Sequence, residues 1–314
     1  MSQDLHNFVT QYLPEIEDTL FKNLPVSHQP GTHRFNDALH YVIFPGGKRW
    51  RPLFTLLGGM IAGSAPQALY PAACAIEYLH SSSMIIDDLP AMDDADLRRG
   101  KPCLHVAYDE STALLVSLGL MNQSYSLLAL TCRKSGHSRM AGRLITHAVD
   151  CIGGNGMIGG QVVDLKLRGN RLVNDVLVSR NLKTTALMGL MMTAGAIAAN
   201  AYEEEIAVLS KFGEALGMAY QIYDDLLDES GEVEAIGKPL KQDARHRLPN
   251  FVSAYGSCGA RKMAAQLISD ANADIEAKFG NCREVRLLAA AAETIAASHN
   301  LSLLSSKFEL ISAS

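Results

Sequence analysis

Apolar residues recur at steps of three and four positions through most of the chain. Two such runs are Leu114, Leu115, Leu118 and Leu120, and Ile206, Leu209, Phe212 and Leu216. This spacing places apolar side chains on one face of an α-helix, which completes a turn every ~3.6 residues. The pattern breaks at turn-like stretches such as FPGGKRWRP (44–52), GGNGMIGG (153–160) and ESGEVEAIGKP (229–239). The sequence therefore predicts about ten helices joined by short connections.

The order of these elements indicates the fold class. No strands alternate with the helices, and no repeat of fixed length is visible. We therefore expect an all-α fold, in which sites are built from side chains on facing helices. Because no linker interrupts the pattern, a single domain should span residues 1–314. A hydrophobic content of 48% is sufficient for a large core.

Composition excludes several classes of partner and site. The net charge of -5 gives no basic surface for a nucleic-acid backbone, so no nucleic-acid partner is expected. The six cysteines form no CxxC pair, which argues against zinc or a disulfide framework. No signal-like N-terminus is visible, and the longest apolar stretch identified, Leu187 to Asn200, is shorter than the ~20 residues of a membrane span. We expect a soluble, cytoplasmic protein.

Two clusters of aspartates follow apolar helical runs. The first, in MIIDDLPAMDDADLRRG, contains Asp87, Asp88, Asp93, Asp94 and Asp96, and the second, in YQIYDDLLD, contains Asp224, Asp225 and Asp228. Asp224 and Asp228 share one helix face, because they are four positions apart. Carboxylates ~4 Å apart repel by several kcal/mol at an effective dielectric near 20, so burying such clusters demands cations.

Magnesium suits these carboxylates, because it is usually held by one or two carboxylates together with substrate phosphates. For a single cluster, the alternative is a solvated helix surface. A calcium loop would need alternating acids around a central Gly, a pattern that DDLPAMDDADLR lacks. Pro90 interrupts the first helix, so helical periodicity leaves open whether Asp93 or Asp94 returns to the metal face.

Candidate anion-binding cations lie in other segments. PGGKRWRP contributes Lys48, Arg49 and Arg51, NLKTT contributes Lys183 and Thr184, and IGKP contributes Lys238. Arg binds phosphate oxygens bidentately and Lys adds a point charge, so the first turn could bind a diphosphate without metal. His80, seven residues before Asp87, should lie on the same side of its helix. The alternatives are solvated basic turns and a core histidine.

One motif is rejected. GNGMIG (154–159) matches the dinucleotide fingerprint GxGxxG, but the preceding segment has a helical pattern and no βαβ unit surrounds it. The chain also lacks a P-loop GK[ST] and a GxSxG elbow. A dinucleotide enzyme and a nucleophile-based hydrolase are therefore not supported.

In order, the segments GGKRWRP, EYLHSSSMIIDDLPAMDDADLRRGKP, LKTT, YQIYDDLLD and IGKP resemble the motif series of the trans-prenyl diphosphate synthases, the farnesyl and geranylgeranyl diphosphate synthase family. The resemblance covers roughly residues 35 to 255. It implies about ten core helices around a deep central cavity, in a homodimer. The implied enzyme ionises an allylic diphosphate, which isopentenyl diphosphate attacks before a proton is lost.

The resemblance also implies roles for individual residues. The magnesium ligands would be Asp87, Asp93, Asp224 and Asp228, with Asp88 and Asp225 adjacent, and about three ions would bind with diphosphate. This favours Asp93 over Asp94. The isopentenyl diphosphate side would be Lys48, Arg51, His80 and Arg99, and the allylic side Arg98, Lys183, Thr184, Gln221 and Lys238. The catalytic group would be Asp87, Asp88, Asp93, Arg98, Lys183, Asp224, Asp225 and Lys238.

The chain departs from the family pattern in places. Ser117-Leu118 replaces a Gly-Asp pair, Thr185 replaces a Gly, and Arg245-His246-Arg247 replaces Lys-x-Thr. These departures leave one cation position in doubt and remove no metal ligand.

The family resemblance also predicts the product length. In this family, the residues four and five positions before the first aspartate form the bottom of the product tunnel. Here they are Ser83 and Ser82, both small. They leave room for a further isoprene unit, whose five carbons are worth ~4 kcal/mol on burial, so geranylgeranyl diphosphate (C20) is expected. Farnesyl diphosphate (C15) would follow if Met121 or Tyr125 closes the tunnel. A class I terpene cyclase and a non-catalytic synthase subunit are remoter alternatives.

Overall fold

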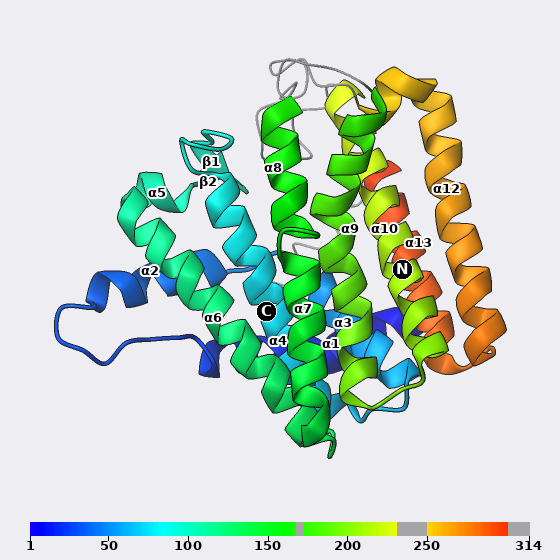
Figure 1. Ribbon diagram of the computed structural model, residues 1–314. Coiled ribbons are helices and arrows are strands. Elements are labelled where there is room, and N and C mark those ends of the chain that lie inside the picture. The colour runs from blue at the N-terminus through cyan, green and yellow to red at the C-terminus, as the bar shows by residue number, and fades with distance from the viewer. Residues whose placement is uncertain (168–172, 231–249, 301–314) are drawn as a thin grey trace.

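The computed structural model describes residues 1–167, 173–230 and 250–300 (Figure 1). Its helices are α1 (Gln3–Lys22), α2 (His33–Ile43), α3 (Trp50–Ile61), α4 (Pro66–Asp87), α5 (Leu104–Ala107), α6 (Glu110–Lys134), η1 (Ser138–Met140), α7 (Ala141–Ile152), α8 (Met157–Leu167), α9 (Val173–Ala198), α10 (Glu203–Ser230), α12 (Phe251–Phe279) and α13 (Arg283–Asn300). Across these ranges, the strands are β1 (Leu97–Arg98) and β2 (Lys101–Pro102), which pair antiparallel. The predicted all-α fold is confirmed.

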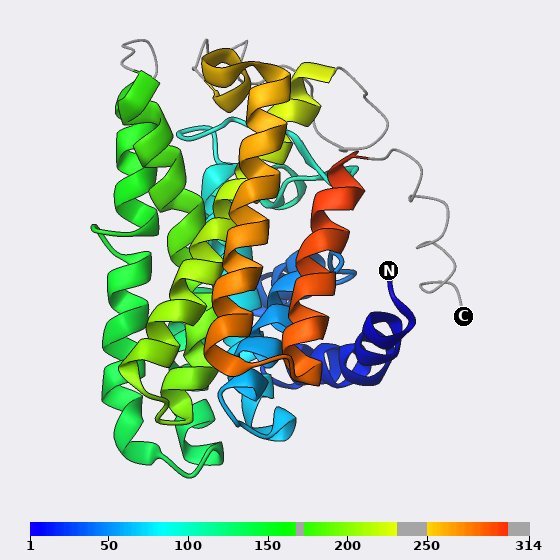
Figure 2. The same ribbon diagram turned by 90° about the vertical axis from the view of Figure 1, so that its right-hand side faces the viewer.

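The long helices run roughly side by side (Figures 1 and 2). α4 packs against α6 and α3, while α9 packs against α3, α8 and α10, and α10 also packs against α12. Large apolar side chains such as Tyr78, Phe54 and Phe212 are fully or almost fully buried between them. The glycine segment around Gly154 joins α7 to α8, two helices, which agrees with rejecting the dinucleotide motif.

The end of α4 is set by Pro90, which has no N–H and disfavours helical backbone at the residue before it. The following loop folds back on the helix end: the Asp93 N–H donates to the Asp87 carbonyl at 2.9 Å. Asp94 has a left-handed backbone (φ 50°) and is exposed. The loop therefore returns Asp93 to the end of α4, while the exposed side chain of Asp94 lies beside it in the sequence.

A short hairpin follows this loop. Arg98 pairs with Lys101, and the two residues between them, Arg99 and Gly100, have φ values of 52° and 73°. Positive φ at both central positions defines the type I′ turn, whose twist matches that of a hairpin. The hairpin thus presents two consecutive arginines beside the C-terminal end of α4.

Helix α6 has one buried face and one solvent-exposed face. Val116 and Leu120 are fully buried, whereas Leu114, Leu115 and Leu118 are exposed. By length and composition, α6 is the one helix in the described ranges that could cross a membrane. The sequence reading predicted a helix here from its apolar periodicity but took the shorter apolar run in α9 as the longest apolar stretch.

Candidate active site

The acidic centre lies at the end of α4. Asp87 is 7% exposed, and Lys183 of α9 lies with its Nζ 3.3 Å from the Asp87 Oδ2. Burial raises the pKa of Asp87, the charge of Lys183 opposes this, and the charge of Asp93 raises the pKa further. The structure therefore brings three of the predicted site residues together: a buried Asp87, with Lys183 beside it and Asp93 close enough to influence its charge.

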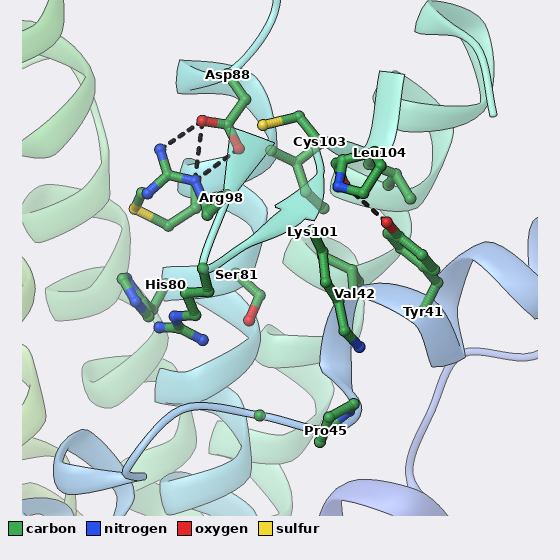
Figure 3. A pocket seen from close by; sticks show the side chains of 15 residues that line it. Tyr41, Val42, Pro45, His80, Ser81, Asp88, Arg98, Lys101, Cys103 and Leu104 are labelled. Atoms are coloured by element: carbon green, nitrogen blue, oxygen red, sulfur yellow. Dashed lines mark hydrogen bonds and ion pairs between the residues drawn. The ribbon is translucent and has the colours of Figure 1, made fainter. Parts of the chain in front are cut away.

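Asp88 points elsewhere and holds the hairpin. It is 4% exposed, and its Oδ1 and Oδ2 accept hydrogen bonds from the Arg98 Nε at 2.9 and 2.7 Å, with a further contact from Arg98 Nη2 to Oδ1 (Figure 3). Burial lowers the pKa of Arg98, but the hydrogen bonds and charge of Asp88 outweigh this and raise it overall. This bidentate pair fixes the hairpin against α4.

A cavity of about 220 Å³ lies beside this pair, between α2, α4 and the hairpin. Figure 3 shows Tyr41 and Lys101 on one side of it and His80 on the other. The Tyr41 hydroxyl donates to the Pro102 carbonyl at 2.8 Å, and the Lys101 Nζ lies 5.8 Å from the centroid of the Tyr41 ring. These contacts join α2 to the hairpin that carries the arginines.

Basic side chains gather around His80 of α4, which also lines this cavity. The Arg51 Nη1 lies 3.2 Å from the His80 Nε2, while the Arg51 Nε is buried without a hydrogen-bond partner among the described atoms. Partial burial lowers the pKa of Arg99, and the positive charges of Arg51 and Arg98 add to that lowering. A buried guanidinium N–H without an acceptor is costly, and a phosphate oxygen would satisfy it. Lys48 is exposed at the edge of this group.

The second acidic segment lies on α10, together with Tyr220, a residue that the sequence reasoning missed. The charge of Asp224, followed by burial, raises the pKa of Tyr220 to about 12, whereas the charges of Arg51 and Arg99 lower it. The hydroxyl is therefore influenced both by the acidic face of α10 and by the basic side chains. Tyr220 lies one helical turn before Asp224, and this spacing could have indicated from the sequence that it belongs to the site.

Asp225 forms hydrogen bonds that connect two helices. It is 2% exposed; its Oδ1 accepts from the Gln221 Nε2 at 3.0 Å and its Oδ2 from the Phe251 N–H at 2.8 Å. Phe251 is the first residue of α12, where a carboxylate is favourable because helix N-termini carry unpaired N–H groups. Asp225 therefore ties α10 to α12, and Gln221 of α10 holds the Asp225 carboxylate.

Some predicted residues have no described side-chain environment. Asp228 belongs to α10, but its side chain lies outside the described part of the chain, as do Lys238 and Arg245-His246-Arg247. Thr184 follows Lys183 on α9 and is half-buried.

The two predicted chain-length residues lie within α4. Ser82 is fully buried, and its hydroxyl lies 2.9 Å from that of Ser117 on α6, which also contacts the Ser82 carbonyl at 3.1 Å. The Ser83 hydroxyl donates to the His80 carbonyl at 2.9 Å. The departure at Ser117 thus places a hydroxyl directly against Ser82.

Gln161 of α8 is another residue that the sequence reasoning missed. Its Nε2 lies 3.8 Å from the Met92 sulfur in the loop before Asp93, and its Oε1 is buried without a partner among the described atoms. The preceding Gly160 has no room for a side chain, because an added Cβ would lie 2.5 Å from the Lys183 backbone nitrogen. The sequence feature that could have indicated Gln161 is the GGQ segment (159–161), because its small glycines let α8 approach Lys183 and the aspartate loop.

The acidic donors suit a shared metal site. No three His, Cys, Asp or Glu side chains converge as a metal cluster within residues 1–167, 173–230 and 250–300. Magnesium needs no such cage, because it retains waters and binds one or two carboxylates together with phosphate oxygens. The buried Asp87 and the neighbouring, half-buried Asp93 suit magnesium in this mode.

Comparisons with known proteins indicate the family to which the chain belongs. The family model described as polyprenyl synthetase matches residues 32–304. The chain is 34% identical over 262 residues to farnesyl diphosphate synthase of Bacillus subtilis (strain 168), covering 83% of this chain and 88% of that protein. It is 32% identical over 264 residues to geranylgeranyl diphosphate synthase of Cyanophora paradoxa, covering 83% and 86%.

A solved structure also resembles the chain. The geranyltransferase of Helicobacter pylori complexed with magnesium and isoprenyl diphosphate superposes with a TM-score of 0.77 at 28% identity, over 94% of this chain and 97% of that one. The similarity therefore extends over nearly the whole length of both chains.

Proposed function

The chain belongs to the polyprenyl synthetase family, and we propose that it condenses isopentenyl diphosphate with an allylic diphosphate to give geranylgeranyl diphosphate. It is a prenyltransferase of the short-chain prenyl diphosphate synthases. The observation that carries the proposed site is the charge arrangement. Asp87 lies with Asp93 beside it at the C-terminal end of α4, and Arg51 of α3 leaves a buried donor unsatisfied beside His80, a residue of α4.

The residues divide into two halves. Asp87 and Asp93, with Asp224 and Asp228 from α10, would hold Mg²⁺, about three ions with diphosphate bound. When bound, Mg²⁺ would stabilise negative charge on the allylic diphosphate as it leaves. Lys183 and Arg98 add positive charge on that side, together with Lys238 and the hydroxyl of Thr184. Asp88 orients Arg98, while Asp225 orients Gln221 on the helix that carries Asp224.

The second diphosphate would be held without metal. Arg51 and Arg99 can bind phosphate oxygens bidentately, Lys48 adds a point charge, and His80 supports the Arg51 guanidinium at 3.2 Å. Binding in this way would place the double bond of isopentenyl diphosphate beside the allylic carbon that loses its diphosphate. The surrounding helices would exclude water, which would otherwise trap the allylic cation.

For the product, we propose C20. Ser82 and Ser83 are small, and Ser82 faces a second small residue, Ser117. Neither position carries the bulky side chain that would stop elongation at C15. The relatives include both farnesyl and geranylgeranyl diphosphate synthases, so farnesyl diphosphate is the alternative product.

Ser82→Phe is expected to shorten the main product from C20 to C15, because the ring would occupy the volume of the last isoprene unit. Since the Ser117 hydroxyl is only 2.9 Å away, the variant is best made together with Ser117→Gly to avoid overpacking. Mass spectrometry of the products from each allylic primer measures the effect. Ser82→Ala with Ser117→Gly, which adds no bulk, should leave the product at C20. An unchanged product ladder in the Phe variant would show that Ser82 does not limit the chain.

We also propose a homodimer built on α6. Leu114, Leu115 and Leu118 are 43%, 59% and 59% exposed on one helix, and Val149 on the adjacent α7 is 49% exposed. A second copy would cover this apolar surface, as contiguous exposed apolar patches commonly mark interfaces.

Changing Leu115 and Leu118 to Glu is expected to convert the dimer to a monomer, because charges at the interface centre would be desolvated without partners. Light scattering during size-exclusion chromatography measures the mass. Tyr202→Glu, an equally polar change at a residue 76% exposed between α9 and α10, should leave the dimer intact. A wild-type monomer would contradict the proposal.

We propose that residues 1–314 form one polyprenyl synthetase domain in the cytoplasm. The family match over residues 32–304 supports the single domain. Both substrates are charged, water-soluble diphosphates, which suits a cytoplasmic enzyme without a nucleic-acid partner.

A further inference from the structure

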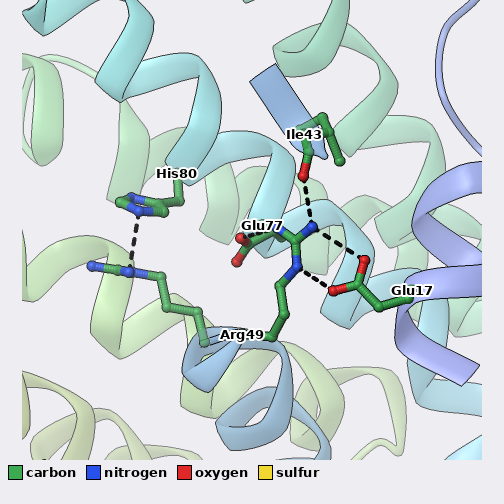
Figure 4. A network of polar contacts seen from close by, with 6 residues as sticks. Glu17, Ile43, Arg49, Glu77 and His80 are labelled. Atoms are coloured by element: carbon green, nitrogen blue, oxygen red, sulfur yellow. Dashed lines mark hydrogen bonds and ion pairs between the residues drawn. The ribbon is translucent and has the colours of Figure 1, made fainter. Parts of the chain in front are cut away.

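Arg49 lies between Lys48 and Arg51 in the sequence, yet its side chain turns into the core. Only 2% of the side chain is exposed, and its backbone is left-handed, with φ 51° and ψ 29°. In Figure 4 its guanidinium lies between Glu17 and Glu77, while His80 lies apart and contacts a second guanidinium. The sequence reading grouped Arg49 with the basic turn and gave it no role of its own.

The guanidinium is held on every side. Its Nε donates to Glu17 Oε1 at 2.7 Å and its Nη2 to Glu17 Oε2 at 3.2 Å. Its Nη1 donates to Glu77 Oε1 at 2.6 Å, and Nη2 also donates to the Ile43 carbonyl at 2.7 Å. These acceptors belong to α1, α4 and the end of α2. One side chain therefore joins three helices to the turn before α3.

The turn is built around this side chain. A Cβ added at Gly46 would lie 1.9 Å from the Arg49 Cζ, so only glycine leaves room for the guanidinium. A left-handed backbone is strained for a residue with a side chain and persists only where the surroundings fix it. The network around Arg49 supplies that constraint, in a segment that contributes two substrate-binding candidates.

The same turn contacts the rest of the basic group. The first helical turn of α3 carries Arg51, which lies against His80, and a Cβ at Gly47 would lie 2.9 Å from the Arg99 Cζ. The path of residues 46–51 therefore determines how Arg51 and Arg99 approach each other. Lys183 and Asp87, by contrast, contact each other across α9 and α4.

We propose that Arg49 is a positioning residue: bound by Glu17 and Glu77, it fixes the turn so that Lys48 and Arg51 face isopentenyl diphosphate. This inference rests on the proposed function, and it adds a device outside the substrate contacts. With one guanidinium and two carboxylates, the network also leaves a negative charge behind the basic group. Consistent with this, the charge of Glu77 raises the pKa of Arg99, against the lowering that burial causes.

Steady-state kinetics of Arg49→Lys and Glu17→Gln test the proposal. Lysine keeps the charge but cannot reach three acceptors, and a displacement near 1 Å in a binding group can cost about 100-fold. We expect the KM for isopentenyl diphosphate to rise about 30-fold or more in Arg49→Lys, with the KM for the allylic substrate changed less than about 3-fold. Glu17→Gln, at a side chain 36% exposed, should fold normally and show a smaller rise of the same kind.

The control separates positioning from general stability. Leu144→Ala removes a fully buried side chain from α7, which should lower Tm without a selective change in either KM. A lower Tm with both KM values unchanged in Arg49→Lys and Glu17→Gln would overturn the inference. Equal rises in both KM values would also overturn it. If the wild-type protein lacks turnover, the proposed function fails instead, so the two failures are distinguishable.

Discussion

Asp87→Asn is expected to lower kcat about 1,000-fold or more at saturating substrates. The change removes a carboxylate that lies 3.3 Å from Lys183, in a pair whose crowding with Asp93 fits Mg²⁺. Metal stabilisation of a leaving group is worth several kcal/mol, and each ~1.4 kcal/mol of barrier changes the rate tenfold. The measurement is kcat of the purified variant over a range of Mg²⁺ concentrations.

Asp94→Asn is the matched control. Asp94 is exposed and has a left-handed backbone, a conformation that Asn adopts readily. Its kcat should stay within about 3-fold of the wild-type value, because surface substitutions of this kind have small effects. If the two variants lost activity equally, the assignment of the metal side to Asp87 and Asp93 would be wrong.

Arg51→Gln is expected to raise the KM for isopentenyl diphosphate about 100-fold, with little change for the allylic substrate. Its buried Nε has no acceptor within the described structure, and two lost hydrogen bonds to a charged group cost ~3 kcal/mol or more. Initial rates with one substrate varied at saturating concentrations of the other give both KM values.

Arg34→Gln provides the comparison for this variant. Arg34 is an exposed arginine that donates from Nε to Asp109 Oδ2 at 3.1 Å and from Nη2 to the Tyr108 carbonyl at 2.6 Å. Its loss should leave the KM for isopentenyl diphosphate within about 3-fold of wild type. A KM for Arg51→Gln no higher than that of the control would exclude Arg51 from the diphosphate site.

The helices could be predicted because their signals are local. Apolar periodicity predicts the helical fold, and the spacing of Asp224 and Asp228 predicts a shared face. The path after Pro90 could not be predicted from periodicity, since it depends on backbone hydrogen bonds that bring Asp93 back to Asp87. Only the family resemblance favoured Asp93 at that stage.

Other features depend on partners distant in sequence. Arg49 turns inward because its acceptors are Glu17, 32 residues earlier, and Glu77, 28 residues later. Ser117 appeared only as a departure from a pattern, and its contact with Ser82 required the packing of α4 on α6. Charge type alone cannot separate a substrate-binding arginine from a buried structural one, since both occur in KRWR.

The most direct test of the two-site account is turnover by the purified protein with Mg²⁺, isopentenyl diphosphate and an allylic primer, followed by mass spectrometry of products and assay of released inorganic diphosphate. The account predicts linear prenyl diphosphates, up to C20, with one inorganic diphosphate released per condensation. It also predicts no product when isopentenyl diphosphate is omitted or when EDTA removes the metal. A cyclic hydrocarbon from the allylic diphosphate alone, or no turnover with both substrates and Mg²⁺, would contradict it.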